Sequence, residues 1–169
     1  MRIPIPDEKD IQQSVLEMLR KWFVDRPPTP TYRAMSLTPD VADKFLQLRD
    51  RIMNHGNVER GIKEMIAVRV SLLNNCNPCL LSHMRKLKSI YGEDTVKKVS
   101  EFPESEVTDM ERAILEFVDE AVENRGEVTD ETFNQLKEFF SPEEMVEIVE
   151  VICLYMFLNM FNKVLDITE

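Results

Sequence analysis

Two cysteines and a histidine lie close together in the sequence, at a spacing that suits thiol chemistry. Cys76, Cys79 and His83 form the pattern C-x-x-C-x-x-x-H. On a helix, at about 100° per residue, the three side chains fall within a roughly 60° arc of one face. Cys76 is expected in the first turn, where free N–H groups and the helix dipole favour a thiolate. Pro78 suits that turn because it has no N–H to leave unpaired.

This arrangement favours redox chemistry at the thiols. The thiolate is the reactive form of cysteine, and a free cysteine with a pKa near ~8.5 is mostly protonated at neutral pH. His83 lies four residues after Cys79, the spacing at which helical side chains meet, so it can act as a base. A sulfenic acid on one cysteine can condense with the other to a disulfide. We therefore expect Cys79 to attack and Cys76 to resolve the product.

The local pattern also leaves two other interpretations open. A zinc site could use these three side chains but needs a fourth ligand. The remaining candidates are Cys153, in an apolar run where we expect a buried filler, and His55, in a turn where we expect exposure. The two cysteines could also be ordinary structural residues.

The composition describes one acidic domain. The chain has 169 residues, a formal net charge of −10 and only 4 Gly, which favours a single helical domain. An acidic surface repels phosphate backbones, so we expect no nucleic-acid partner. The first ten residues lack a signal pattern, and the apolar run 151–161 is too short to span a bilayer. We therefore expect a soluble, cytoplasmic protein without membrane contact.

The pattern of apolar residues and stop signals predicts an all-α fold. A first helix is expected over 8–24, and Pro27, Pro28 and Pro30 predict an extended connector after it. We therefore divide the chain into an N-terminal helical arm and connector, 1–30, and a helical domain, 31–169. Caps and glycines predict further helices over about 38–54, 58–73, 76–91, 93–102, 108–122, 129–139 and 141–166.

The last predicted helix is apolar nearly all round between Val151 and Phe161. Such a helix is expected to be buried on all sides. A domain of this size cannot easily cover every face of it, and large exposed apolar patches usually mark interfaces. We therefore expect a homo-oligomer.

The segment that carries the cysteines resembles a known family. Glu64 is followed by eleven residues, the C-x-x-C pair, three residues and His83. This signature is similar to that of the AhpD-like alkylhydroperoxidases within the carboxymuconolactone decarboxylase superfamily. The flanks 61–71 and 83–92, the segment 141–149 and the run from Asn159 to Lys163 resemble the family too. The likeness covers about 35–166.

The resemblance implies an AhpD-like helical bundle in which a helical hairpin carries the cysteines. It implies that Glu64, Cys76, Cys79 and His83 form a proton relay and a redox-active pair, with Glu64 buried and facing His83. By its own surroundings Glu64 would pass for a solvated helix residue. We expect that the protein needs no metal, haem, flavin or other cofactor. Its reducing equivalents are expected to come from an external dithiol, such as a lipoyl group or a thioredoxin-like protein, and the resembling family forms trimers and hexamers.

The expected function is therefore that of a peroxidase: a thiol-dependent hydroperoxide reductase, or a related dithiol–disulfide oxidoreductase, with an antioxidant role. Pro78 stands where the best-known peroxidases of the family carry a second histidine, so one relay member is missing. The alternatives are a non-redox enzyme on the same scaffold, such as a carboxymuconolactone decarboxylase, or a metal-binding or assembly protein. The decarboxylases that name the superfamily lack the cysteine pair.

Overall fold

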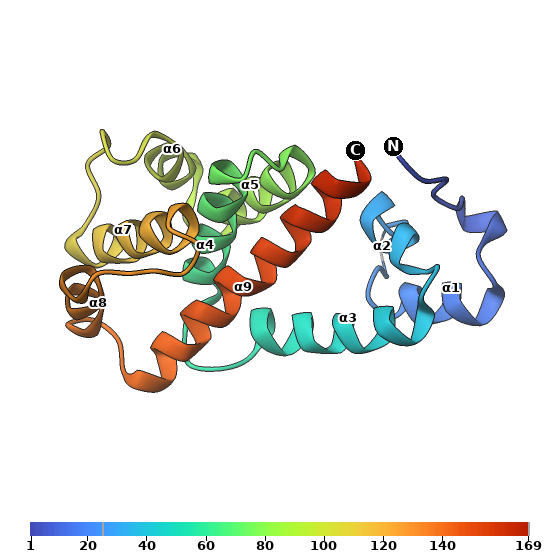
Figure 1. Cartoon of the computed structure of the whole chain (residues 1–169), viewed down its shortest axis with the longest axis horizontal. Helices are drawn as coiled ribbons and strands as arrows, with labels where there is room; N and C mark the ends of the chain where they lie inside the picture. The colour runs from blue at the N-terminus through green and yellow to red at the C-terminus, as the bar shows by residue number, and fades with distance from the viewer. Residues whose placement is uncertain (25, 169) are drawn as a thin grey trace.

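The protein is helical throughout the part of the chain described by the computed structural model, residues 1–24 and 26–168. Within these residues there is no strand, so the all-α prediction is confirmed (Figure 1). A short 3₁₀ helix, η1 (Glu8–Asp10), precedes the α-helices. These are α1 (Gln13–Arg20), α2 (Pro30–Met35), α3 (Pro39–Asn54), α4 (Arg60–Leu73), α5 (Asn77–Tyr91), α6 (Glu93–Glu101), α7 (Asp109–Glu123), α8 (Asp130–Lys137) and α9 (Pro142–Leu165).

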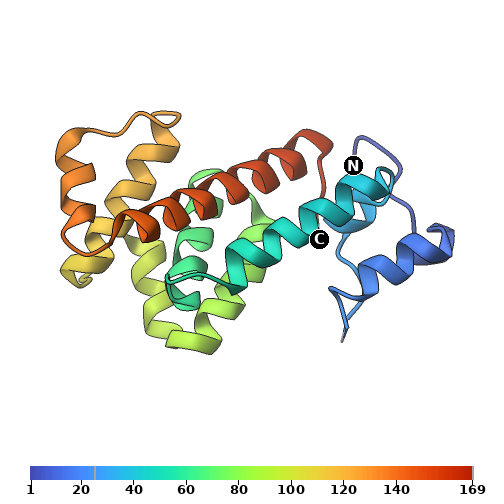
Figure 2. The same cartoon turned by 90° about the horizontal axis from the view of Figure 1, so that it is seen from below.

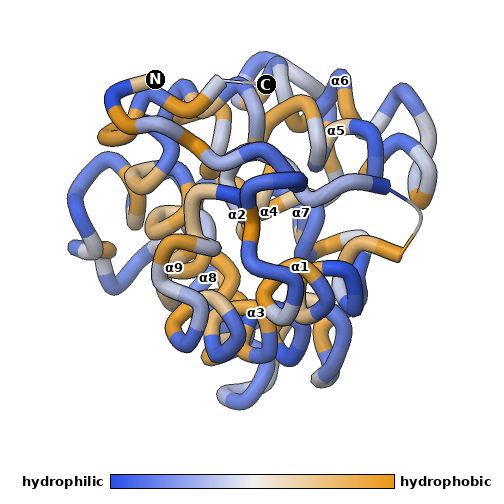
Figure 3. The backbone as a smooth tube through the Cα atoms, turned by 90° about the vertical axis from the view of Figure 1, so that its right-hand side faces the viewer, coloured by the Kyte–Doolittle hydropathy of each residue, from blue (hydrophilic) through white to orange (hydrophobic). Residues whose placement is uncertain are grey.

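Local capping signals explain most of these helix boundaries. Thr108 and Ser141 each accept a hydrogen bond from a backbone N–H three residues on, where a glutamate bonds back to the cap, so both capping boxes form. Gly92 ends α5 with a φ of 89°, a backbone conformation that glycine adopts without strain. Orange and blue stretches alternate along the backbone in Figure 3, as amphipathic helices require.

Helix α4 forms the centre of the bundle. It packs against α5, α6, α7 and α9, and every residue from Gly61 to Ser71 is buried. A Cβ on Gly61 would overlap the ring of Tyr91, so only glycine fits where these two helices approach. Because α4 is enclosed, any charged side chain on it must find a partner inside the protein.

The N-terminal segment contains less helix than predicted, and it packs against the bundle. Of the helix predicted over 8–24, only η1 and α1 form. The predicted connector ends one residue earlier than expected, because α2 begins at Pro30. A proline in the first turn suits a helix start. Helix α1 packs on α3, and the N-terminal amine bonds Asp166 after α9. The domain division after residue 30 stays a prediction.

Helix α9 differs from the expectation that it is buried on all sides. It packs against α3, α4, α7 and α8 (Figures 1 and 2). Its outward side chains are nevertheless exposed in the single chain. The prediction that this helix is buried on all sides is therefore wrong for the single chain. With 24 residues it is also long and apolar enough to span a membrane, a property that core helices share. Its large exposed apolar side chains, together with the exposed cysteine, are Val146, Val149, Cys153, Phe157, Met160 and Val164, which we call the α9 stripe.

Candidate active site

Helices α4 and α5 form a tight pair that brings the predicted site residues together. Only residues 74–76 connect them, and the N–H of Cys76 donates to the carbonyl of Ser71 across the turn. The helix begins at Asn77, so Cys76 is the N-cap of α5 and not part of its first turn, a correction of one residue. The thiols still lie at the positive end of the helix dipole.

Glu64 and His83 form a buried hydrogen-bonded pair between α4 and α5. The Nδ1 atom of His83 lies against one carboxylate oxygen of Glu64, and Arg60 pairs with the other. The carboxylate is fully buried and His83 is 6% exposed. The structure thus places Glu64 where the resemblance implied. Its neighbours in the sequence suggested a solvated residue, but its side chain is buried because α4 is enclosed on every side.

The charges of this pair follow from its surroundings. Burial alone would raise the pKa of Glu64, but the hydrogen bond and charge of His83, with the charges of Lys86 and Arg60, lower it to about 2. Burial lowers the pKa of His83 to about 4, against the opposing effect of Glu64. At neutral pH the carboxylate is therefore ionised and the imidazole neutral. The Nδ1–H then donates to Glu64, which leaves Nε2 free to accept a proton.

The two cysteines contact each other in the reduced state. Their Sγ atoms lie 2.9 Å apart and both side chains are buried. The amide of Asn162 on α9 lies 3.3 Å from Cys79 Sγ and 3.7 Å from Cys76 Sγ, so it can donate to a thiolate on either. Thr31 on α2 fixes this amide by donating to its Oδ1 at 2.9 Å. Three separate helices therefore position the sulfur atoms.

The sulfur pair holds one proton more readily than two. A hydrogen bond from Cys79, backbone and Asn162 hydrogen bonds, and the charge of Lys163 lower the pKa of Cys76 to about 6, against its burial. The hydrogen bond to Cys76, burial and the negative charge of Cys76 raise the pKa of Cys79. The favoured state at neutral pH is thus an S–H···S⁻ pair whose charge rests mainly on Cys76.

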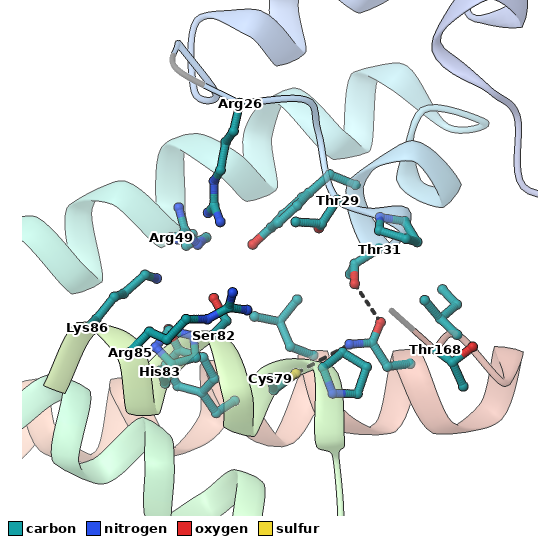
Figure 4. A pocket seen from close by; sticks show the side chains of 17 residues that line it. Arg26, Thr29, Thr31, Arg49, Cys79, Ser82, His83, Arg85, Lys86 and Thr168 are labelled. Atoms are coloured by element: carbon teal, nitrogen blue, oxygen red, sulfur yellow. Dashed lines mark hydrogen bonds between the residues drawn. The ribbon is translucent and has the colours of Figure 1, made fainter. Parts of the chain in front are cut away.

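Cys79 and His83 line a cavity of about 70 Å³ between α2, α3, α5 and α9. Figure 4 shows Arg26, Arg49, Arg85 and Lys86 gathered at one side of it, and Cys79 lies toward the other. Cys76 instead faces a separate hollow bordered by the C-terminal end of α9. Of the two thiols, Cys79 is therefore the one beside His83 in this cavity.

Sequence reasoning missed several residues of this site. It did not assign Asn162 or Thr31 to the cysteines, although the run from Asn159 to Lys163 was already part of the resemblance. Arg49 and Tyr155 of the cavity gave no local signal, because they come from α3 and α9.

The residues outside the site have different surroundings. His55 is exposed, as expected, and lies 3.4 Å from Asp50. Cys153 is exposed, so the prediction of a buried filler is wrong: it belongs to the α9 stripe. Among residues 1–24 and 26–168, no group of three or more histidine, cysteine or acidic side chains could hold a metal ion.

The geometry agrees with the likeness to known proteins. Residues 39–95 match the model of the carboxymuconolactone decarboxylase family, a span that includes α3, α4 and α5. The structure resembles an AhpD-core, peroxidase-related protein of Ralstonia eutropha, with 21% identity, 96% of this chain and 88% of that one covered, and a TM-score of 0.82. The fold is thus AhpD-like. The segment 39–95 is thus similar to the carboxymuconolactone decarboxylase family, and the chain as a whole shares the fold of AhpD-like proteins.

Two further structures extend this comparison. A protein of unknown function from Agrobacterium tumefaciens, a putative antioxidant defence protein AhpD, is 25% identical over 80% of this chain and 94% of its own, with a TM-score of 0.74. The debrominase Bmp8 in complex with 2,3,4-tribromopyrrole is 22% identical over 99% of this chain and 90% of its own, with a TM-score of 0.80. The comparison with curated proteins gave no match. Bmp8 is similar in fold, which by itself assigns no activity to this chain.

Proposed function

We propose that the protein is a thiol-dependent hydroperoxide reductase. The observation that carries this proposal is the contact between Cys76 and Cys79 beside a neutral, Glu64-bonded His83, at a cavity open to a small substrate. A dithiol next to an acid–base group is what peroxide reduction needs. The family and the peroxidase-related structures of the same fold add support.

The reaction begins with a thiolate on Cys79, the sulfur that faces the cavity. The pair carries its charge mainly on Cys76 at rest, so the shared proton first passes across the 2.9 Å contact. Cys79 Sγ then attacks the outer peroxide oxygen: an S–O bond forms, the O–O bond breaks, and the leaving alkoxide takes a proton from solvent to become an alcohol. Asn162 Nδ2, at 3.3 Å, is placed to stabilise the thiolate by donating to it.

The second step closes the disulfide. Cys76 attacks the sulfenic sulfur of Cys79, and hydroxide leaves and is protonated to water. His83 Nε2 takes the proton released by the second thiol and returns it to the leaving hydroxide, and Glu64 stabilises the transient imidazolium. Overall, two thiols and one hydroperoxide give a disulfide, an alcohol and water. An external dithiol, such as a lipoyl group or a thioredoxin-like protein, must then reduce Cys76–Cys79.

A thiol titration tests this function. The experiment uses a Cys153→Ser background, because Cys153 is exposed and would react independently. One equivalent of hydrogen peroxide or tert-butyl hydroperoxide should remove two thiols, and mass spectrometry should locate a Cys76–Cys79 disulfide. Unchanged thiols, with catalysis that survives thiol blocking, would instead favour a non-redox enzyme on this scaffold.

Single substitutions assign the two roles. Cys79→Ser should abolish peroxide consumption, whereas Cys76→Ser should react once and stop at a sulfenic acid that dimedone traps on Cys79. The reverse result would make Cys76 the attacking thiol, the role that its lower pKa favours. Full turnover in both variants would contradict redox chemistry at this pair.

We also propose that the enzyme is a soluble, cytoplasmic homo-oligomer. Members of the α9 stripe follow one another at intervals of three or four residues, the spacing of a helix–helix seam. Leu48 and Val41 on α3 are exposed beside it, and the rings of Phe45 and Phe157 lie 4.9 Å apart. The two helices thus present one continuous apolar surface, which a second subunit would cover.

A further inference from the structure

The cavity beside Cys79 is positively charged, although the protein is strongly acidic. Arg26, Arg49, Arg85 and Lys86 all line it, and among its described lining residues there is no aspartate or glutamate. The chain as a whole has a formal net charge of −10. Four cations at one small opening are therefore a local feature, of the kind that concentrates anions.

Two of these cations lack the carboxylate partners that other buried cations have. Arg69 pairs with Asp119, and Lys63 with Glu147 at 3.0 Å. Arg49, in contrast, is half-buried with its guanidinium carbon 5.7 Å from the Tyr32 ring centre. Among the residues that the structure describes, neither the side chain of Arg49 nor that of the half-buried Lys86 has a partner in a hydrogen bond or an ion pair.

Mutual repulsion and burial make this arrangement costly. Burial and the charges of Arg49, Arg60 and Arg26 lower the pKa of Lys86 to about 8, against the opposing charge of Glu64. Removing a cation from water without an opposite charge is unfavourable. A bound anion would restore the balance.

An unpartnered hydroxyl belongs to the same cavity. Tyr155 is fully buried, lines the cavity, and has the only buried side-chain oxygen or nitrogen without a hydrogen-bond partner among the residues that the structure describes. Its ring lies edge-on to His83, with centres 4.5 Å apart. Burial raises its pKa, so it remains a neutral O–H donor. Buried donors are nearly always satisfied, and a ligand oxygen would satisfy this one.

We infer that Arg49, Lys86 and the Tyr155 hydroxyl bind the carboxylate of the substrate, and that the substrate is a carboxylate-bearing organic hydroperoxide. This inference rests on the proposed function. Arg49 supplies a fork of N–H donors that matches two carboxylate oxygens, and Lys86 adds a point charge. The remaining part of the molecule reaches Cys79, where the O–O bond breaks as described above.

The spacing along α5 sets the shape of this substrate. Cys79, His83 and Lys86 follow one another at intervals of four and three residues and share a face of the helix. At 1.5 Å per residue, the Cα atoms of Cys79 and Lys86 are separated by about 10 Å along the axis. Figure 4 shows Lys86 and Arg49 at one side and Cys79 at the other. The carboxylate and the hydroperoxide therefore occupy opposite ends of an elongated molecule.

Rates with two matched substrates test the inference. The probes are a six-carbon carboxylate with a terminal hydroperoxide and its methyl ester, with oxidation of the cysteines followed in a single turnover. The Cys153→Ser protein should oxidise faster with the acid, by about 10- to 100-fold, the value of one or two charge-assisted hydrogen bonds. Arg49→Met and Lys86→Met should collapse the ratio of acid to ester rates. Lys88→Met, an exposed change on the same helix, should preserve it.

A binding measurement separates this inference from the proposed function. Hexanoate should bind the reduced protein in calorimetry, hexanamide should not, and Tyr155→Phe and Arg49→Met should each weaken hexanoate binding. This result would support the anion site even if peroxides never oxidised the cysteines. Equal rates for acid and ester, or equal binding of hexanoate and hexanamide, would overturn the carboxylate assignment and leave the redox chemistry untouched.

Discussion

Helices α4 and α9 show opposite relations between polarity and burial. Helix α4 carries Lys63, Glu64 and Arg69, yet all three are buried. Helix α9 is far more apolar, yet Met160 is 64% exposed and Phe157 48% exposed. Each buried charge of α4 has an opposite charge beside it, which for Glu64 is Arg60, whereas the α9 stripe has no covering element in the single chain as described.

This difference shows that position in the bundle decides burial here. Because α4 is surrounded, its charges must find partners inside, and Glu64 finds Arg60 and also His83, its partner in the proposed relay. Because α9 lies at the edge, its outer side is free for another subunit. The polar residues of the candidate site therefore lie inside the bundle, and the apolar side chains of the α9 stripe lie on its surface.

The largest expected effect comes from breaking the hydrogen-bonded pair Glu64–His83 between α4 and α5. Glu64→Gln and His83→Ala should each slow oxidation of the cysteines by about 10²–10⁴-fold, because a positioned acid–base group is lost. Stopped-flow peroxide kinetics on folded protein, checked by circular dichroism, measures this. Glu59→Gln is the matched control, since Glu59 lies exposed at the N-cap of α4 and its carboxylate accepts a hydrogen bond from Tyr91. An unchanged rate in Glu64→Gln would remove Glu64 from the relay.

A second test concerns Lys63, a buried charge of α4 that lies outside the candidate site. The Nζ of Lys63 donates to the carbonyls of Ile52 and His55, at 2.8 and 2.5 Å, and pairs with Glu147. Lys63→Met should lower the free energy of unfolding by about 3 kcal/mol, because it leaves these acceptors unpaired. Urea unfolding measures the loss. Lys97→Met, on the exposed side of α6, should change it by less than about 0.5 kcal/mol.

The pH dependence of stability sharpens the same contrast. The pKa of His83 is lowered to about 4 from 6.5, so between these values the unfolded chain binds more protons and stability falls as pH falls. At about 1.4 kcal/mol per pKa unit, the loss is on the order of 3 kcal/mol. The pKa of Glu64, lowered to about 2 from 4.5, extends the loss to lower pH.

Urea unfolding at pH 7, 5.5 and 4 measures this slope. His83→Asn should flatten it between pH 6.5 and 4, whereas His55→Asn, at an exposed position, should leave it in place. A wild-type protein whose stability rises as the pH falls toward 4 would contradict the neutral, buried imidazole.

The smallest effect on the stability of the single chain is expected from a substitution in the α9 stripe. Met160→Glu should reduce the mass in light scattering toward that of a single chain, because a carboxylate in an apolar seam is costly. The unfolding free energy of each subunit should change by less than about 0.5 kcal/mol, since Met160 is mostly exposed. Lys97→Glu serves as the control on another face. A wild-type protein that is already monomeric at micromolar concentration would show that the stripe has another role.

Local sequence signals determined the helices and the arrangement of the thiols. The capping boxes at Thr108 and Ser141 begin α7 and α9 because the bonds they make lie within four residues. The C-x-x-C-x-x-x-H spacing puts Cys79 and His83 on one helix face, where the structure has them lining one cavity. The same reasoning failed at Pro30, the last residue of the predicted connector, where α2 begins.

Only the tertiary structure decided which groups these residues meet. Asn162 reaches Cys79 from 83 residues away, and Thr31 reaches Asn162 from 131 residues away. Arg49 and Tyr155 enter the cavity from helices that carry no thiol. Periodicity along a chain says which side of a helix is apolar, but it contains no information on which helices meet. The burial of Glu64 and the exposure of Phe157 therefore depend on the packing of α4 at the centre of the bundle and α9 at its edge.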